Sequence, residues 1–447
     1  AVERIQKAIQ KNESIMIFGD YDVDGTSSVA LLSMYLESLG LKIIKYLPDR
    51  KKEGYGVSIN AIDHAFSKNH KLIIALDCGI KAHKQVEYAK EKGIEFIICD
   101  HHNPDKNLPK ALAILNPKRK DCAYPFKELC GCGVGFKLVQ AVESKQSKNN
   151  QIINYLDLVA LAIAADVVPL TGENRVLAFI GLQIINSNPR PGVHSLLKKN
   201  VKKEYTISDL MYYVGPRINA AGRMKHASLA LELLICNDIN SVEKLALEIE
   251  DLNTSRRDIE KDITSQAIEQ VDNSSEKLNS IVVFDSNWNK GVIGIVASRL
   301  VDKYYKPSIV FCESSKGVLT ASARSIKGLD LYSVLNQCKG FIDQFGGHKY
   351  AAGLTIKKEN LEGFKKHFEN IEYKDEDLNL FLDLDLSGFA LNAKDYLENS
   401  SMIEFEFRHH LTEEQWKKGR KMFLLSVLKK EKIFFHFYQK IKNMKIK

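Results

Sequence analysis

The sequence lacks any long run of apolar residues. None approaches the ~20 residues that a membrane-spanning helix needs, and the composition of 45% hydrophobic and 27% charged residues is typical of a globular protein. The first residues, AVERIQK, predict an amphipathic helix without the apolar core of a signal peptide. We therefore expect a cytoplasmic protein with no membrane association. Because no initiator Met is present, we also expect the chain to be part of a longer product.

Cysteine is scarce, with eight residues in 447. Cys78 and Cys99 lie in apolar stretches, as expected in a reducing compartment. The one cluster consists of Cys122, Cys130 and Cys132, and no second Cys or His pair follows at the spacing of a zinc site. The pattern excludes a disulfide scaffold and predicts structural thiols.

The net charge of +8 is unevenly distributed. Between Trp416 and Lys447 there are eleven Lys or Arg residues against one acid, Glu431, so the rest of the chain is slightly negative. Aromatic residues such as Phe434 and Tyr438 alternate with these cations and could stack on bases while the cations follow a phosphate backbone. A Lys-rich solvated surface around ordinary strands explains the pattern equally well.

Acidic side chains follow a series of apolar segments. The motif Gly19–Gly25 (GDYDVDG) comes after a strand-like run at 15–18, and the next two strand-like runs end at Asp77 and at 100–102 (DHH). Asp166 ends a further apolar segment. One such Asp usually caps a helix, but the carboxyl ends of parallel strands share one sheet edge. Since oxygen ligands suit Mg²⁺ and Mn²⁺, we predict a metal site there.

These motifs resemble the DHH phosphoesterase superfamily and, within it, the RecJ family of single-strand-specific 5′→3′ exonucleases. The resemblance covers roughly residues 1 to 370. Four later stretches agree with it in order: Gly215–Arg223, Gly291–Arg299, Ser322–Ser325 and Gly346–Gly353. The last three resemble the DHH-associated (DHHA1) domain.

The resemblance implies a two-metal centre that uses Mn²⁺ or Mg²⁺ for phosphodiester hydrolysis. The implied metal ligands and supporting carboxylates are Asp20, Asp22, Asp24, Asp77, Asp100, His101 and Asp166, and the implied catalytic triplet is Asp100, His101 and His102. Adjacent side chains on an extended segment point in opposite directions, so the two histidines are not expected to share a role. We expect His101 to bind metal and His102 to orient or protonate a phosphate oxygen, with this division left open.

The resemblance also implies a set of substrate contacts. Arg50, in a Gly-rich basic loop, is expected to meet a 5′ phosphate. Further expected contacts are Arg217, Asn219 and Arg223 in a Gly/Ala-rich loop, Ser322 and Arg324 on the terminal phosphate or backbone, and His348 on a phosphate. We expect Arg324 and His348 to lie in loops.

Strand-like and helix-like segments alternate through most of the chain, which predicts an α/β fold. We expect a parallel-sheet DHH domain at 1–238 and a second α/β domain, DHHA1, at 277–370. A charged segment of helical period without Gly or Pro predicts a helical linker at 239–276. Residues 371–447 are expected to form a partial OB-like β region that binds nucleic acid.

The function that the resemblance implies is metal-dependent 5′→3′ degradation of single-stranded DNA to 5′-mononucleotides in DNA repair and recombination, whereas the spacing of the motifs alone indicates only a phosphoesterase. A channel between the two domains would admit one strand and reject a duplex. A RecQ-type helicase and a single-strand-binding protein are the partners expected by family analogy, and the protein is expected to be a monomer. The alternatives are a DHH oligoribonuclease or cyclic-dinucleotide phosphodiesterase, which the extra C-terminal region disfavours, and a non-catalytic DHH scaffold, which the intact carboxylates disfavour.

Overall fold

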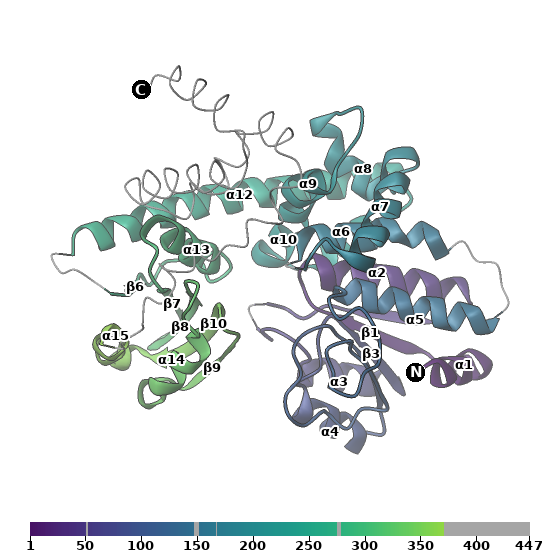
Figure 1. Ribbon diagram of the computed structural model, residues 1–447, viewed down its shortest axis with the longest axis horizontal. Coiled ribbons are helices and arrows are strands. Elements are labelled where there is room, and N and C mark those ends of the chain that lie inside the picture. The colour runs from purple at the N-terminus through teal and green to yellow at the C-terminus, as the bar shows by residue number, and fades with distance from the viewer. Residues whose placement is uncertain (51, 147–151, 167, 275–278, 371–447) are drawn as a thin grey trace, which may run out of the picture. The chain divides into compact units, whose positions relative to one another are not determined.

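The computed structural model describes residues 1–50, 52–146, 152–166, 168–274 and 279–370 (Figure 1). The chain divides into two compact units, Ala1–Asp258 and Ile259–Lys447, and each has its own five-stranded sheet. The predicted OB-like region and the basic segment from Trp416 lie outside the described residues. Within the described ranges, no helix combines the length and the apolar character needed to cross a membrane.

The first unit is built on a fully parallel sheet. Its strands are β1 (Ile15–Gly19), β2 (Ile43–Tyr46), β3 (Leu72–Leu76), β4 (Glu95–Cys99) and β5 (Ala113–Leu115). They lie in the order β2-β1-β3-β4-β5, and every neighbouring pair is parallel. All residues of β1 and β3 are buried, because helices cover both faces of the sheet. The predicted α/β fold with a parallel sheet is confirmed.

The register of the three central strands explains where the acidic motifs lie. Gly19 pairs with Leu76, and Leu76 pairs with Cys99. Asp20, Asp77 and Asp100 are the residues that follow these partners, so they leave the sheet at the same level. The carboxyl edge of the sheet therefore carries one acidic residue from each of three adjacent strands.

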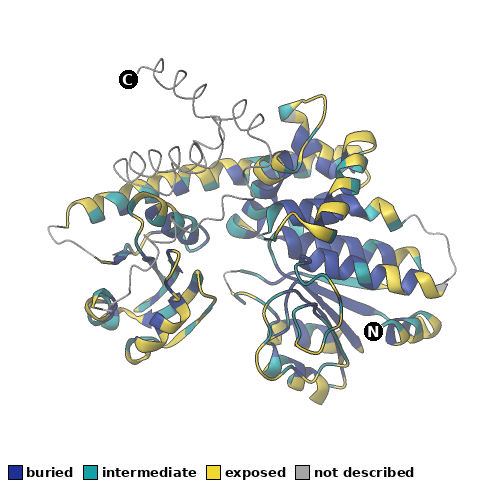
Figure 2. Ribbon diagram, in the orientation of Figure 1, coloured by how far each residue is buried: buried dark blue, intermediate teal, exposed yellow. Residues whose placement is uncertain are grey.

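Two apolar cores lie on the two faces of this sheet, visible as dark blue ribbon in Figure 2. The smaller core packs α3 and α4 on one face, and the larger core packs most of the other helices on the opposite face. The helices of the unit are α1 (Val2–Lys11), α2 (Val23–Ser38), α3 (Ile59–Ser67), α4 (His83–Glu91), α5 (Gly131–Gln146), α6 (Leu156–Ala165), α7 (Gly172–Ser187), α8 (Pro191–Leu197), α9 (Ile207–Asp209), α10 (Gly215–Met224) and α11 (Ser228–Ile235).

Helix α10 corrects one expectation. The Gly/Ala-rich stretch that contains Arg217, Asn219 and Arg223 was predicted to be a loop, and it is a helix entered through a π-helical turn at Leu210–Val214. Alanine is the strongest helix former, and the small residues 220–222 are buried in the packed helix. The small side chains of residues 220–222 therefore allow the helix to pack closely against its neighbours.

The predicted linker helix is present as α12 (Ile239–Asp272), which has 34 residues. Its first half contributes Val242 and Ile249 to the larger core of the first unit. Its second half belongs to the second unit, where the Gln266 side chain accepts a hydrogen bond from the indole Nε1 of Trp288 at 2.8 Å. The helix is thus shared by the two units.

The second unit has a mixed sheet in the order β6-β7-β8-β10-β9. Only β6 and β7 are parallel, and burial alternates along β8 and β10 because one face of these strands meets the apolar core. Its elements after α12 are β6 (Ile281–Phe284), α13 (Ile293–Tyr304), β7 (Ser308–Ser315), β8 (Val318–Arg324), α14 (Leu331–Gln337), β9 (Gln344–Gly347), β10 (Ala351–Lys357) and α15 (Leu361–Glu369).

Arg324 was predicted to lie in a loop, and this was wrong. It ends β8, where its backbone pairs with Ser308 on one side and with Ala351 on the other. The small residues around it suit a central strand between two close neighbours. His348 lies in the turn between β9 and β10, as expected, and its N–H donates to the Ala351 carbonyl at 2.8 Å.

Candidate metal centre and active site

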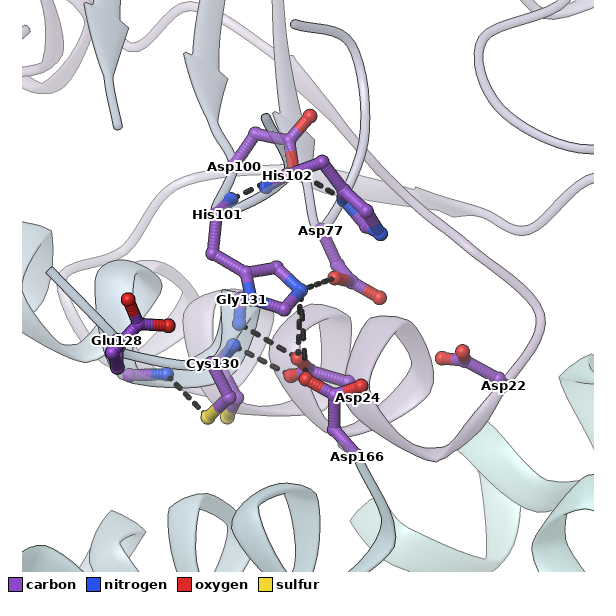
Figure 3. Close-up of polar contacts among 12 residues, drawn as sticks. Asp22, Asp24, Asp77, Asp100, His101, His102, Glu128, Cys130, Gly131 and Asp166 are labelled. Carbon is purple, nitrogen blue, oxygen red and sulfur yellow. Dashed lines mark hydrogen bonds and ion pairs between the residues drawn. The ribbon is translucent and has the colours of Figure 1, made fainter. Parts of the chain in front are cut away.

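Asp24 is anchored between two helices of the first unit. The Asp22 side chain caps α2 by accepting the Gly25 N–H at 3.0 Å, which places Asp24 in the first turn. The two oxygens of Asp24 accept the N–H groups of Gly131 and Cys132 at the start of α5, at 2.6 Å each (Figure 3). The start of α5 therefore orients a carboxylate, because its first N–H groups have no partner within the helix.

Gly131 also allows Asp77 to reach the same place. A Cβ atom at position 131 would lie 2.6 Å from both Cβ and Oδ1 of Asp77, which is closer than real Cβ atoms come. Asp77 itself has a φ of 59°, in the left-handed region. The sequence analysis, which started from the acidic motifs, missed this support. A Gly-rich helix start near carboxylate motifs was the available signal.

The cysteines on either side of Gly131 are buried in this turn, and one of them contacts its backbone. Cys130 and Cys132 are buried, and burial raises the pKa of each thiol well above its usual value. The Cys130 sulfur accepts the Gly133 N–H at 3.3 Å. These contacts agree with the expectation of structural thiols.

His101 lies at the centre of the carboxylate cluster (Figure 3). Its Nε2 atom is 3.2 Å from Asp77 Oδ1, 3.5 Å from Asp166 Oδ2 and 3.9 Å from Asp24 Oδ2. Asp166 reaches this point from the C-terminal end of α6. Residues from four separate segments thus meet at one ring nitrogen, as the sequence motifs predicted.

Several polar atoms in this cluster are buried without a hydrogen-bond partner among the described residues. They are Asp20 Oδ1, Asp77 Oδ1, Asp166 Oδ2 and His101 Nδ1. Two sets, Asp77–His101–His102 and Asp24–His101–Asp166, each bring their ligand atoms within 4.8 Å of one another. A divalent cation would satisfy such atoms, because carboxylate and imidazole groups are the ligands that Mn²⁺ and Mg²⁺ sites use. The donor set therefore fits a metal centre.

Electrostatics also favour a cation at this site. Burial, followed by repulsion from neighbouring carboxylates, raises the pKa of Asp20, Asp24 and Asp77 well above its usual value. Burial lowers the pKa of His101 to about 4, so its ring is neutral at pH 7 and keeps a lone pair for coordination. Without a cation, these buried carboxylates lower the free energy of unfolding, because they are desolvated and repel one another.

Asp100 supports the histidine pair. One of its oxygens, Oδ1, accepts the backbone N–H groups of His101 and His102 at 2.7 and 3.0 Å and lies 2.7 Å from His102 Nδ1. The other accepts the Ile80 N–H at 2.9 Å. Burial opposes ionisation of Asp100, but the hydrogen bond from His102 and the charge of that ring lower its pKa to about 2. Asp100 thus fixes the backbone and the ring of the histidine pair, which is the supporting role expected of it.

The Nε2 atom of His102 lies beside Tyr55. The Tyr55 hydroxyl lies 3.2 Å from this nitrogen, and the two rings meet edge to face with their centroids 6.0 Å apart. The backbone carbonyl of His102 accepts a hydrogen bond from the Asn116 amide at 2.8 Å. Sequence reasoning missed both partners, because neither belongs to an acidic or basic motif.

Two of the predicted cations lie beside the cluster. The Arg50 guanidinium stacks over the Tyr21 ring at 4.8 Å. Burial raises the pKa of Tyr21 to about 12, and the charges of Arg50 and Arg223 act against this rise. Arg223 follows Gly222, where a Cβ atom would lie 3.5 Å from Tyr21 Cβ. Tyr21 lies between Asp20 and Asp22, and this places positive charge next to the carboxylates.

Of the other predicted substrate residues, Arg217 and Asn219 lie in the first unit and the rest in the second. Arg217 is buried and pairs with Glu250 of α12 at 2.6 Å, while it also donates to the Tyr213 carbonyl. Asn219 is half-buried in α10. Ser322, Arg324 and His348 belong to the second unit, where a Cβ atom at Gly294 would lie 3.1 Å from both Arg324 Nη2 and Ser322 Oγ. Ser322 and Arg324 are therefore neighbours that share one helix start.

Comparison with known sequences places these features in a family. The sequence model described as "DHH family, N-terminal domain" matches residues 14–163, and the "DHHA1 domain" model matches residues 277–373. A single-stranded-DNA-specific exonuclease RecJ of Bacillus subtilis is 40% identical over 377 residues, covering 83% of this chain and 47% of that protein. The protein of the same name from Haemophilus influenzae is 39% identical over 389 residues, covering 82% of this chain and 68% of its own length. The chain thus spans about half to two thirds of these relatives.

Solved structures give the same result for the fold. An exonuclease RecJ bound to manganese superposes with a TM-score of 0.74 at 30% identity, covering 82% of this chain and 92% of that one. RecJ of Thermus thermophilus in complex with Mn²⁺ superposes with a TM-score of 0.73 at 28% identity, covering 82% of this chain and 53% of that one. The arrangement of the elements is therefore that of known metal-binding nucleases.

Proposed function

The chain belongs to the RecJ family of DHH proteins, and we propose that it is a metal-dependent exonuclease that degrades single-stranded DNA from the 5′ end to 5′-mononucleotides. Its relatives carry the name of single-stranded-DNA-specific exonucleases. The family membership that the motifs predicted is confirmed. A role in DNA repair and recombination follows from the same membership.

One observation carries the proposal, namely the meeting of Asp24, Asp77 and Asp166 at His101 Nε2. The orphaned polar atoms of this cluster make it a site for Mn²⁺ or Mg²⁺, with Asp20 and Asp22 as further oxygen donors. When bound, such ions lower the pKa of water and offset the charge of a scissile phosphate. The intact ligand set argues against a non-catalytic scaffold.

The residues of the chain then have distinct tasks. His101, neutral at pH 7, offers a ring nitrogen among the carboxylates. His102 is held by Asp100 through Nδ1, and its Nε2, which lies beside the Tyr55 hydroxyl, would hold a proton or donate one to a phosphate oxygen at the site. Asp100 fixes the orientation of that ring, as the buried carboxylate does in other acid–base pairs.

Strand binding is assigned to the cations around the site. Arg50 and Arg223, both close to Tyr21, would attract the negative backbone next to the carboxylates and so offset their repulsion of phosphate. In the second unit, Ser322 and Arg324 on β8 and His348 in the β9–β10 turn would contact phosphates. We assign no contact to Arg217, whose guanidinium is committed to Glu250.

Several finer expectations stay predictions. They are the channel for one strand, the monomeric and cytoplasmic state, the docking of a RecQ-type helicase and a single-strand-binding protein, and the OB-like region. The preferred metal is an outcome of the assay described below. Cleavage of short oligoribonucleotides or cyclic dinucleotides is the second candidate activity, and no contact in the described residues favours it.

The test uses long single-stranded DNA labelled at the 5′ or the 3′ end, incubated with Mn²⁺, with Mg²⁺ or with EDTA. We expect metal-dependent release of mononucleotides from the 5′ end, with duplex DNA left intact. Cleavage restricted to dinucleotides or cyclic dinucleotides would replace the proposal with the small-substrate activity. Strand binding without cleavage under every metal condition would replace it with the scaffold.

A further inference from the structure

The segment between β2 and α3 is organised around one carboxylate, that of Glu53. Its Oε1 atom accepts the backbone N–H of Asp49 at 2.8 Å. Its Oε2 atom accepts the hydroxyl groups of Tyr46 at 2.9 Å and of Ser58 at 2.5 Å. Tyr46 ends β2, and Ser58 caps α3. The Glu53 side chain thus ties together the end of the strand, the start of the loop and the start of the next helix.

The backbone of this loop has a conformation that these hydrogen bonds stabilise. We call residues 49, 50 and 52–56 the Arg50 loop. The Asp49 carbonyl accepts the N–H of Glu53 at 2.7 Å, and Gly54 and Gly56 both have φ near 82°, in the left-handed region. A Cβ atom at either glycine would have nothing within 4 Å, so glycine is present here for its conformation. Tyr55 is held between these two turns.

The Arg50 loop delivers two side chains to the candidate active site. The Arg50 guanidinium lies over Tyr21 at 4.8 Å, and the Tyr55 hydroxyl lies 3.2 Å from His102 Nε2. Arg50 adjoins Asp49, whose N–H is bound to Glu53, and Tyr55 is two residues beyond Glu53. Glu53 itself is half-buried, and these hydrogen bonds of its carboxylate all lie within the segment from Tyr46 to Ser58.

We propose that Glu53 is a positioning residue that, through the N–H of Asp49, holds Arg50 in place for the 5′-terminal phosphate of the strand. The inference rests on the proposed function, because it assumes a strand that enters by its 5′ end. Three hydrogen bonds to one carboxylate restrain the segment strongly. A displacement of about 1 Å in a substrate-positioning group lowers activity by roughly 10²-fold. The expected consequence is a defect in recognising the 5′ end, with the chemical step preserved.

The experiment compares the full chain and its Glu53→Gln variant on two single-stranded substrates, one with a 5′ phosphate and one with a 5′ hydroxyl. We expect KM for the phosphorylated strand to rise about tenfold, while kcat and the KM for the hydroxyl strand stay within about twofold. Arg50→Ala is the reference variant. The double variant should be no worse than Arg50→Ala alone, because both changes act through the same guanidinium.

Two further variants separate positioning from folding. Tyr46→Phe removes one of the three donors and keeps the stacking of its ring on Phe18, whose centroid is 5.7 Å away, so it should give a smaller defect of the same kind. Glu37→Gln, which breaks an exposed ion pair with Lys45 outside the loop, should leave both substrates unaffected. Unfolding temperatures are measured for all variants, and Tyr46→Phe serves as the test if Glu53→Gln does not fold.

The outcomes discriminate clearly. Equal loss on both substrates, additive effects in the double variant, or the same KM for both ends in the unaltered protein would overturn the inference. A protein that releases no nucleotides from any single strand would instead overturn the proposed function. A loss of the preference for the 5′ phosphate in the Glu53 and Arg50 variants, with a smaller loss in Tyr46→Phe and none in Glu37→Gln, would support the inference.

Discussion

The two sheets of this protein concentrate opposite kinds of chemistry. In the first, all strands are parallel, and the in-register ends of β1, β3 and β4 bring three carboxylates to one edge. In the second, most strands are antiparallel, and its cationic and hydroxyl candidates lie along β8 and in the β9–β10 turn. The first site is buried and acidic, and the second is half-buried or exposed and basic.

The difference follows from strand direction. In a parallel sheet all carboxyl ends lie at the same edge, so acidic residues far apart in sequence come together there. Because these carboxylates are buried, their mutual repulsion is strong and favours a bound cation. In an antiparallel sheet the carboxyl ends of neighbouring strands lie at opposite edges. Side chains therefore come together only where residues pair across adjacent strands, as Arg324 pairs with Ala351. We therefore expect the first site to respond to changes as a cooperative unit and the second to respond residue by residue.

The largest effect is expected from Asp77→Asn. Asn tolerates the left-handed backbone of position 77 and has nearly the same side-chain shape as Asp, but the substitution removes a charge from the cluster. Cleavage of single-stranded DNA should fall on the order of 10³-fold or more, since metal ions contribute several kcal/mol to such reactions. The unfolding temperature of the metal-free protein should not fall, because a repelling charge has been removed.

Asp105→Asn is the matched control for that variant. Asp105 is a half-exposed acid near Lys81 and His83, away from the ligand set. It should retain full activity. Near-normal turnover in Asp77→Asn would mean that the edge of the first sheet is not a metal centre, and the contrast between the two sheets would be lost.

The next largest effect is expected from Gly131→Ala. The added methyl would overlap Asp77 and push it from His101, so activity should fall about 10²-fold. Overpacking should lower the free energy of unfolding by about 1–3 kcal/mol. Gly133→Ala on the same helix makes only ordinary contacts, the nearest at 3.4 Å to Leu129, and should have little effect on either quantity. Equal losses in both variants would indicate a general helix defect.

Metal should stabilise the first unit and leave the second unchanged. At a Mn²⁺ concentration about 100-fold above Kd, linkage adds about 2.7 kcal/mol. Hydrogen exchange should therefore slow in β1, β3 and β4 but not in β7 and β8. Protection that rises equally in both sheets would contradict this contrast.

The metal effect should depend on pH with a definite sign. The raised pKa values of Asp20, Asp24 and Asp77 mean that the metal-free folded state binds more protons than the unfolded state above pH 3.8, so its stability falls as pH rises. Because a bound metal ion displaces those protons, the gain in the free energy of unfolding on adding metal should be larger at about pH 7.5 than at about pH 5.5. Asp100 acts oppositely, since its pKa of about 2 gives stability above pH 3.8 that is lost as pH falls towards 2. Thermal unfolding across pH, with and without Mn²⁺, measures both trends.

The smallest effect is expected in the second sheet, from Arg324→Gln. Loss of one charge-assisted phosphate contact should raise KM about tenfold and reduce the salt dependence of binding by about one unit of slope, with kcat unchanged. Arg299→Gln is the control, because Arg299 is an exposed cation of α13 that pairs with Glu260. A fall in kcat for Arg324→Gln, or equal effects of the two variants, would contradict a separate binding role for the second sheet.

Much of the fold was predictable because its signals are local. Continuous apolar runs such as 72–76 identify buried parallel strands, and the charged run without Gly or Pro identifies α12. The stretch around Arg217 was mistaken for a loop because small residues suit both loops and closely packed helices. Arg324 was misplaced for the same reason, since only its partners on both sides make it a strand residue.

The chain order of its acidic motifs was sufficient to determine the family, the metal-binding chemistry and the edge of the sheet where that chemistry lies. This was possible because parallel strands map sequence position directly onto one edge. The tertiary structure alone decided the supporting contacts: Gly131 beside Asp77, the backbone of α5 on Asp24, Tyr55 at His102 and Glu53 on the N–H of Asp49. The first three join residues across long separations, the last is local, and all of them depend on distances of a few ångströms that no sequence pattern encodes.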